Sequence, residues 1–211
     1  MKHATPYSKQ VLILFLLLAG VASSSMAQTA LITGAMPKDV NYRTTSGAAI
    51  LISGTSTLHD WTMKSSEGTS TGSFTVDADQ KVVRINSLSF SVRGESILSE
   101  HTLMNNKTYE ALKTKKYPNI TFTTSGVIIV PANGNTFTTK SKGKLTIAGF
   151  SKDVEVNASC QFNQADRSVT CTGKQKIKMS EYGVTPPSVM FNTIKTGDDI
   201  TVDFNVKLNR Q

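Results

Sequence analysis

The sequence predicts an all-β protein of about eight antiparallel strands with one short helix. Composition supports this, because 27 of the 211 residues are Thr and 23 are Ser. Thr favours half-buried strands, and Ser competes with the helix backbone for hydrogen bonds. The 6 prolines and 14 glycines are too few for a collagen-like or low-complexity chain. A stronger indication is the alternation of apolar and polar residues along most of the chain.

This alternation has a period of two, which is typical of strands with one face in water. The apolar positions are Trp61 and Met63; Phe74, Val76 and Ala78; Val83 and Ile85; Leu88, Phe90 and Val92; Ile120 and Phe122; Phe137, Leu145 and Ile147; Val154, Val156, Ala158, Cys160 and Phe162; and Ile200, Val202, Phe204, Val206 and Leu208. The phase changes after Ile85, which predicts a β-bulge near Asn86-Ser87. About eight such strands suit a sandwich or a closed barrel, and composition does not choose between them.

One segment departs from the strand pattern. Residues 103–116 place Met104, Tyr109 and Leu112 at helical spacing, with lysines toward the end. Asn105 or Asn106 can cap the start of such a helix, and Pro118 prevents its continuation. We therefore predict a helix of about three turns over residues 103–116.

The N-terminus has the pattern of a secretory signal peptide. Lys2 and Lys9 precede an apolar run that is too short to span a bilayer, and the small residues around Ala27 suit a signal peptidase. We predict a signal peptide over residues 1–27, cut after Ala27, with an uncleaved anchor as the alternative. The protein would then be periplasmic or secreted. Residues 28–47 would form an N-terminal segment that leads into a barrel domain over residues 48–211.

The two cysteines fit a hairpin. If residues 164–167 form its loop, Cys160 lies opposite Cys171 and Phe162 opposite Val169. The same register sets Val154 against Ile177 and Glu155 against Lys176, so that apolar meets apolar and acid meets base. Opposed cysteines in an exported hairpin are close enough for a bridge. We predict a Cys160–Cys171 disulfide, with two buried free thiols as the alternative.

No catalytic or metal-binding motif is recognisable. The chain lacks the H-E-x-x-H, paired C-x-x-C, G-x-S-x-G and phosphate-loop patterns. Downstream of the signal peptide the histidines are His59 and His101, and both suit polar surface positions. We therefore predict a protein that is not an enzyme and needs neither a metal nor a cofactor.

The formal net charge of +8 comes partly from a lysine-rich strand face. This face contains Lys140, Lys142, Lys144, Lys174, Lys176 and Lys178. It can be a solvated outer face that protects strands from aggregation, which we favour, or a stripe that makes transient contact with a membrane surface. Nucleic acid is not an expected partner of an exported protein.

Four blocks of the sequence resemble the YceI-like family. Residues 103–122 match its helix followed by a Tyr-Pro-x-Ile-x-Phe strand, which begins here at Tyr117. Residues 143–154 match its G-x-L-T-I-x-G hairpin, and Tyr182-Gly183 and residues 197–202 match its last two strands. The chain departs from the family pattern at Ala111 and Leu112, where aromatics are usual, and at residues 56–61.

This resemblance implies a lipocalin-like antiparallel β-barrel that is exported to the periplasm. It also implies an apolar lumen for a polyisoprenoid or another long-chain lipid, held without covalent chemistry. The candidate lumen residues are Trp61, Met63, Phe74, Phe90, Phe122, Phe137, Leu145, Ile147, Phe162 and Phe204. An eight-stranded barrel can hold one small ligand or be filled by its own side chains.

Two other functions stay open. A structural or interaction protein of the cell envelope would use the lysine-rich face. An envelope lipid-modifying enzyme would need His59 or His101 beside a carboxylate in the lumen. The sequence leaves the oligomeric state open, a homodimer included.

The predicted disulfide can be tested by alkylation of the unreduced, denatured protein. We expect no mass increase before reduction, and two adducts after it, because a bridged sulfur cannot react with the alkylating agent. Uptake at both cysteines without reduction would show free thiols instead.

Overall fold

The computed structural model describes residues 36–211, which belong to one compact unit, Gly34–Gln211. The predicted signal peptide, residues 1–27, lies outside the described residues. The strands are β1 (Lys38–Arg43), β2 (Ala48–Ser56), β3 (Trp61–Val76), β4 (Val82–Arg93), β5 (Asn119–Thr124), β6 (Val127–Pro131), β7 (Thr136–Ile147), β8 (Phe150–Phe162), β9 (Val169–Lys178), β10 (Ser188–Val189) and β11 (Ile194–Arg210). The helix α1 spans Thr102–Leu112, and 3₁₀ turns occupy Gly94–Ser96 (η1) and Met179–Tyr182 (η2).

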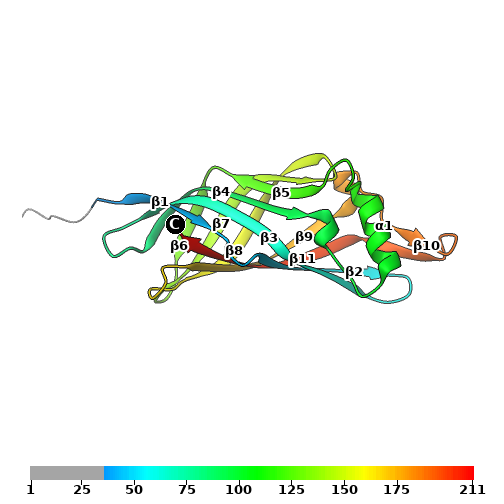
Figure 1. Ribbon diagram of the computed structural model, residues 1–211, viewed down its shortest axis with the longest axis horizontal. Helices are drawn as coiled ribbons and strands as arrows, with labels where there is room; N and C mark the ends of the chain where they lie inside the picture. Colours follow the sequence, from blue (N-terminus) through cyan, green and yellow to red (C-terminus); the bar gives the residue numbers. More distant parts are fainter. Residues whose placement is uncertain (1–35) are drawn as a thin grey trace, which may run out of the picture. The chain divides into compact units, whose positions relative to one another are not determined.

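Eight of these strands form a closed barrel. The pairing runs β3-β2-β11-β9-β8-β7-β5-β4, and β4 returns to β3, so the circle has no free edge. Every pairing is antiparallel. Of the additional strands, β1 pairs with β3 and β11, β6 with β4 and β7, and β10 with β11. The predicted all-β fold is confirmed. Because the eight strands pair in a closed circle, the fold is a barrel and not a sandwich (Figure 1).

The predicted bulge is also confirmed. Ser73 pairs with Ser87 but Phe74 pairs with Ile85, so Asn86 is the extra residue of β4. The Asn86 amide donates to Asp39 Oδ1 at 3.1 Å, and the Thr75 hydroxyl donates to the same oxygen at 2.5 Å. The bond from Thr75, followed by that from Asn86, lowers the pKa of Asp39. The bulge thereby fastens β1 to the barrel.

The helix is shorter than predicted and is capped differently. It ends at Leu112 because Lys113 adopts a left-handed conformation (φ 54°), and the N–H of Lys113 bonds back to Glu110 and Tyr109. The N–H of Thr114 also donates to the Tyr109 carbonyl at 3.1 Å, so the helix ends in a Schellman motif. Asn105 lies inside the helix, and its Oδ1 accepts a 2.7 Å bond from the Ser99 N–H.

One end of the barrel is filled by packed side chains. Here Tyr42 of β1 stacks on Phe74, with ring centroids 4.5 Å apart, and both side chains are fully buried. The same core contains Val40, Val76, Val82, Ile85, Phe137, Cys160, Phe162, Val169, Val206 and Leu208. The segment predicted to lead into the barrel thus contributes β1 and two of the core side chains. In Figure 1, β1 lies at this closed end, and α1 and β10 lie at the opposite end.

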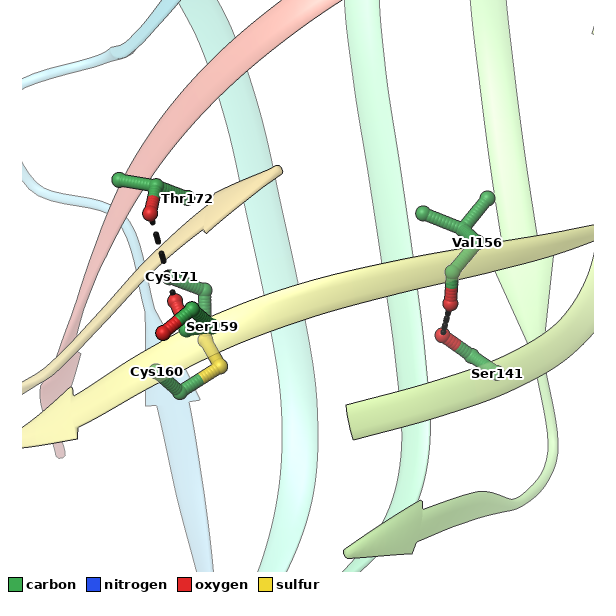
Figure 2. The surroundings of a disulfide bond; sticks show 6 residues. All are labelled: Ser141, Val156, Ser159, Cys160, Cys171 and Thr172. Carbon is green, nitrogen blue, oxygen red and sulfur yellow. Dashed lines mark hydrogen bonds between the residues drawn. A yellow bond between two sulfur atoms is a disulfide. The ribbon is translucent and has the colours of Figure 1, made fainter. Parts of the chain in front are cut away.

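The disulfide joins Cys160 of β8 to Cys171 of β9, in the predicted register. The predicted loop is present as well, because the Asn163 N–H donates to the Ser168 carbonyl at 2.8 Å. Figure 2 shows the bridge between the two strands, with the Thr172 hydroxyl bonded to the Ser159 carbonyl beside it. In the chain-entropy account, a bridge that closes so short a loop stabilises by about 3 kcal/mol.

Beyond this hairpin the predicted register is wrong. The β8–β9 ladder ends at Ala158–Gly173, so neither the Val154–Ile177 pair nor the Glu155–Lys176 pair forms. The two strands diverge because β8 stays paired with β7 as far as Phe150, and β9 with β11 as far as Lys178. Glu155 instead contacts Lys140 of β7 at 3.1 Å, and this bond lowers the pKa of Glu155.

The contacts of Asp166 in the β8–β9 loop can be tested through the pH dependence of stability. Hydrogen bonds from Ser168 and then from Lys207 hold the pKa of Asp166 well below its usual value. A carboxylate whose pKa falls on folding stabilises the protein above its unfolded pKa, near 3.9, and loses that contribution as pH falls further. We expect Asp166→Asn to lower the melting temperature by a constant amount above about pH 5, and by progressively less below about pH 4.

Thermal unfolding from pH 7 to pH 2.5 measures this difference. Asp153→Asn is the control, because exposed Asp153 makes a single 3.3 Å ion pair with Lys144, a type worth little. A deficit in Asp166→Asn that stays the same across the whole pH range would contradict the assignment.

Candidate functional site: the barrel cavity

The half of the barrel away from β1 encloses a cavity of about 480 Å³. This volume is within the range of about 300–1,000 Å³ that small-molecule sites occupy. All eight barrel strands line it, and α1 and the segment after η2 complete the wall. The lining is dominated by aliphatic and aromatic side chains.

The cavity runs along the barrel. At one end it is lined by Leu58, His101 and Leu103, and at the other by Cys171 and Leu208, beside the packed core. Strand β11 alone contributes Ile194, Thr196, Ile200, Val202, Phe204, Val206 and Leu208. At about 3.3 Å per residue these positions cover on the order of 40 Å of strand. Because barrel strands tilt by about 35–45°, this path corresponds to roughly 30 Å along the barrel axis, and a volume of about 480 Å³ over that length makes the cavity long and narrow.

Helix α1 covers the open end. Met104, Ala111 and Leu112 line the cavity, yet no residue of the helix is fully buried. Polar bonds hold the helix to the rim: the Thr108 hydroxyl contacts Met63 Sδ at 3.3 Å, and the Tyr109 hydroxyl donates to the Glu95 carbonyl at 3.0 Å. An element with little buried apolar area is among those that open at low free energy.

Aromatic rings lie flat on the cavity wall because a glycine of a neighbouring strand lies beneath each. A β-carbon at Gly54 would approach Trp61 Cε2 to 2.8 Å, and one at Gly173 would approach Phe204 Cε1 to 2.8 Å. Carbon atoms prefer about 3.5–4.0 Å. Gly68 lies in the same way under Phe90, and Gly143 lies under Phe122. These glycines let the rings line the lumen without filling it.

Two serine hydroxyls in the lumen are satisfied by the barrel itself. The Ser70 hydroxyl donates to the Ser89 carbonyl at 2.9 Å, and the Ser141 hydroxyl donates to the Val156 carbonyl at 3.1 Å (Figure 2). No Asp or Glu is among the described residues that line the cavity, and its only lysine, Lys107, pairs with Glu110 at 2.7 Å. The surface offered to a ligand is therefore almost entirely apolar.

The two histidines lie at the open end and line it. The Nδ1 atom of His59 is 2.6 Å from the Asp60 carbonyl oxygen. Within residues 36–211, no three His, Cys, Asp or Glu side chains gather closely enough to hold a metal ion. None of the helices in this part of the chain is long and apolar enough to cross a membrane.

The lysine-rich strand face is largely paired with acids. Lys174 contacts Asp203 at 3.1 Å, and Lys178 contacts Asp199 at 2.9 Å, which raises the pKa of Lys178. Lys140 and Lys144 contact Glu155 and Asp153. Because these contacts neutralise four of the six lysines, the arrangement resembles a solvated outer face more than an anion-binding stripe.

The predicted lumen residues divide between the two halves of the barrel. Those that line the cavity are Trp61, Met63, Phe90, Phe122, Leu145, Ile147 and Phe204. Phe74, Phe137 and Phe162 face inward too, but they belong to the packed core at the closed end. Alternation identified the inward face correctly, but it carries no information about where Val40 and Tyr42 of β1, which lies in the wall between β3 and β11, fill the barrel.

Sequence reasoning missed the part of the site that does not come from long strands. Leu58, Pro187 and Val189 line the open end from short loops and from β10, where no alternation can develop. The pairing of aromatics with glycines across neighbouring strands, such as Trp61 with Gly54, is a signal for the wall formed by the long strands and does not extend to these residues.

Comparison with known proteins agrees with this geometry. A profile of the YceI-like domain matches residues 43–208. A polyisoprenoid binding domain from Saccharophagus degradans, implicated in plant cell wall breakdown, has a similar structure, with a TM-score of 0.60 and 11% identity over 82% of this chain and 99% of that one. Burkholderia cenocepacia BcnA gives a TM-score of 0.55 and 20% identity over 76% and 95%. No curated protein sequence matches the chain.

The contact between Gly54 and Trp61 can be tested directly. We expect Gly54→Ala to lower the free energy of unfolding by about 1–3 kcal/mol, because the new methyl group meets the indole ring. Trp61 is the only tryptophan of the chain, so its fluorescence reports the displaced ring as a shift of the emission maximum.

Gly126→Ala is the matched control, because no atom lies within 4 Å of the position that its β-carbon would take. Equal effects of the two substitutions on stability and emission would contradict the account of the Trp61 contact.

Proposed function

Because the chain belongs to the YceI-like family, we propose that it binds a polyisoprenoid or another long-chain amphiphile inside the barrel. Binding is non-covalent, and the protein sequesters or carries its ligand. The observation that carries this proposal is the long, narrow and almost entirely apolar cavity. The Saccharophagus degradans domain, which is described as polyisoprenoid binding, supports the same ligand class.

The shape of the cavity favours a chain over a compact molecule. Its lining extends from the loop of Leu58 to Leu208, near the disulfide, while its volume stays at about 480 Å³. A fused-ring ligand would need a wider space over a shorter distance. A flexible hydrocarbon chain can follow the lumen between rings that lie against its wall.

Burial of a chain supplies enough free energy without specific polar contacts. Each buried CH₂ contributes about 0.8 kcal/mol, so an isoprene unit of five carbons contributes roughly 3–4 kcal/mol before ordering costs. A few units therefore suffice for micromolar binding, which needs about 8 kcal/mol net.

We further propose that the protein acts outside the cytosol. The disulfide supports this, because such bonds persist in oxidising compartments. The signal-peptide pattern of residues 1–27 supports it independently. A periplasmic location would bring the barrel close to membrane lipids.

Titration with geranylgeraniol tests the proposed binding. We expect the emission of Trp61 to change saturably in protein stripped of lipid, and native mass spectrometry to show one alcohol per chain. Ala158→Phe should weaken this binding at least about tenfold, because Ala158 lines the cavity and the larger side chain occupies the ligand's space.

Ser159→Phe is the matched control, since Ser159 is the exposed neighbour of Ala158 on the same strand. Circular dichroism verifies that both variants fold. Absence of a saturable signal together with absence of an adduct in the wild-type protein would overturn the proposal, as would equal binding by Ala158→Phe and the wild type.

A further inference from the structure

Large apolar side chains surround the opening of the cavity. Leu58, Leu103 and Met190 are 66%, 61% and 68% exposed, and Phe191 is fully exposed. Leu58 and Leu103 themselves line the cavity. Met190 and Phe191 form the tip of the β10–β11 hairpin, in which the flanking Val189 and Ile194 line the cavity. We call Leu58, Leu103, Met190 and Phe191 the apolar rim.

The hairpin tip exposes its side chains on a backbone of unusual conformation. Met190, Phe191 and Asn192 have φ values of 52°, 53° and 67°, so three consecutive residues with side chains adopt the left-handed conformation. This conformation is unfavourable for such residues, and strain of this kind clusters at functional sites. A turn with glycine at these positions would avoid the strain and would expose no apolar group.

Hydrogen bonds join the tip to the neighbouring loop. The Thr57 N–H donates to the Lys195 carbonyl at 3.0 Å, and the Lys195 N–H donates to the Thr57 hydroxyl at 3.1 Å. The Thr57 hydroxyl in turn donates to the Thr193 carbonyl at 3.2 Å. Leu58 and Phe191 are therefore carried by two loops that are fastened to each other.

We propose that the apolar rim docks the open end of the barrel on a lipid bilayer by inserting into it. The proposal deepens the proposed function and rests on it, since docking would let a long-chain ligand pass between bilayer and cavity without exposure to water. The rim surrounds the opening through which such a ligand would move. Apolar side chains at the end of an apolar cavity make a continuous path for a hydrocarbon chain.

A second protein chain fits this surface less well. The exposed fractions of the four rim residues amount to about three fully exposed side chains. At roughly 150–250 Å² each, these expose less than the roughly 800 Å² that each partner buries in a standard interface. They also project from two loops and from the first turn of α1, around a hollow where a rigid partner would leave a void. A fluid bilayer adapts to such a surface.

The charges near the rim favour insertion over attraction to anionic lipids. Lys107 is paired with Glu110, and two acids, Asp60 and Glu100, adjoin His59 and His101 in the chain. Four lysines of the lysine-rich strand face are paired with acids as well. Docking should therefore depend on buried apolar area and only weakly on salt.

Sedimentation with phosphatidylcholine vesicles tests this docking. We expect the wild-type protein to bind, with a partition coefficient that changes less than about threefold between 50 and 500 mM NaCl. The double variant Met190→Ser/Phe191→Ser should bind about 10- to 100-fold more weakly. The control Ile128→Ser/Val130→Ser removes two side chains that are 63% and 54% exposed on β6, outside the rim, and should bind like the wild type.

Several results would overturn the docking proposal. The first is that the wild-type protein does not bind the vesicles. The second is that both double variants lose the same amount of vesicle binding. The third is that binding requires anionic lipid and disappears at high salt. A dimer in analytical ultracentrifugation that only Met190→Ser/Phe191→Ser abolishes would assign the rim to a second copy instead. Titration of the same variant with geranylgeraniol separates the two proposals, because docking can fail while the cavity still binds the alcohol.

Discussion

Four aromatic rings can lie against the barrel wall because the residue beneath each is a glycine. Trp61 lies over Gly54, and Phe204 lies over Gly173. With any side chain at those positions the rings would have to turn into the lumen, where they would fill a narrow space. The hollow half of the barrel, and every function that needs it, depends on this close approach of ring and backbone.

The barrel is closed at one end and open at the other. The Tyr42–Phe74 stack, the bulge at Asn86 and the Cys160–Cys171 bridge all lie at the closed end and fix its packing. Toward the open end β8 and β9 separate, and α1 rests on polar contacts. The stabilising contacts are thus concentrated at the closed end of the barrel. A ligand would enter the cavity through the open end, near α1.

Alternation and pairing rules predicted much of this fold. They identified the strands, the bulge, and the register that joins Cys160 to Cys171, because each follows from local geometry. They failed for the Glu155–Lys176 pair, since the ladder ends at Gly173 and the two strands then follow their other neighbours, β7 and β11. They could not separate Phe74 from Phe90 either. Both rings face inward, and only the side chains of β1, such as Tyr42 stacked on Phe74, decide which one is packed.

The most direct test of a hollow, chain-binding barrel is a crystal structure of the protein purified without removal of lipid. If the barrel is hollow and binds a chain, continuous, elongated electron density will enter beside α1 and pass between Phe90, Phe122 and Phe204 toward Cys171. A lumen in which these rings have turned inward and left no room for a chain would contradict this prediction.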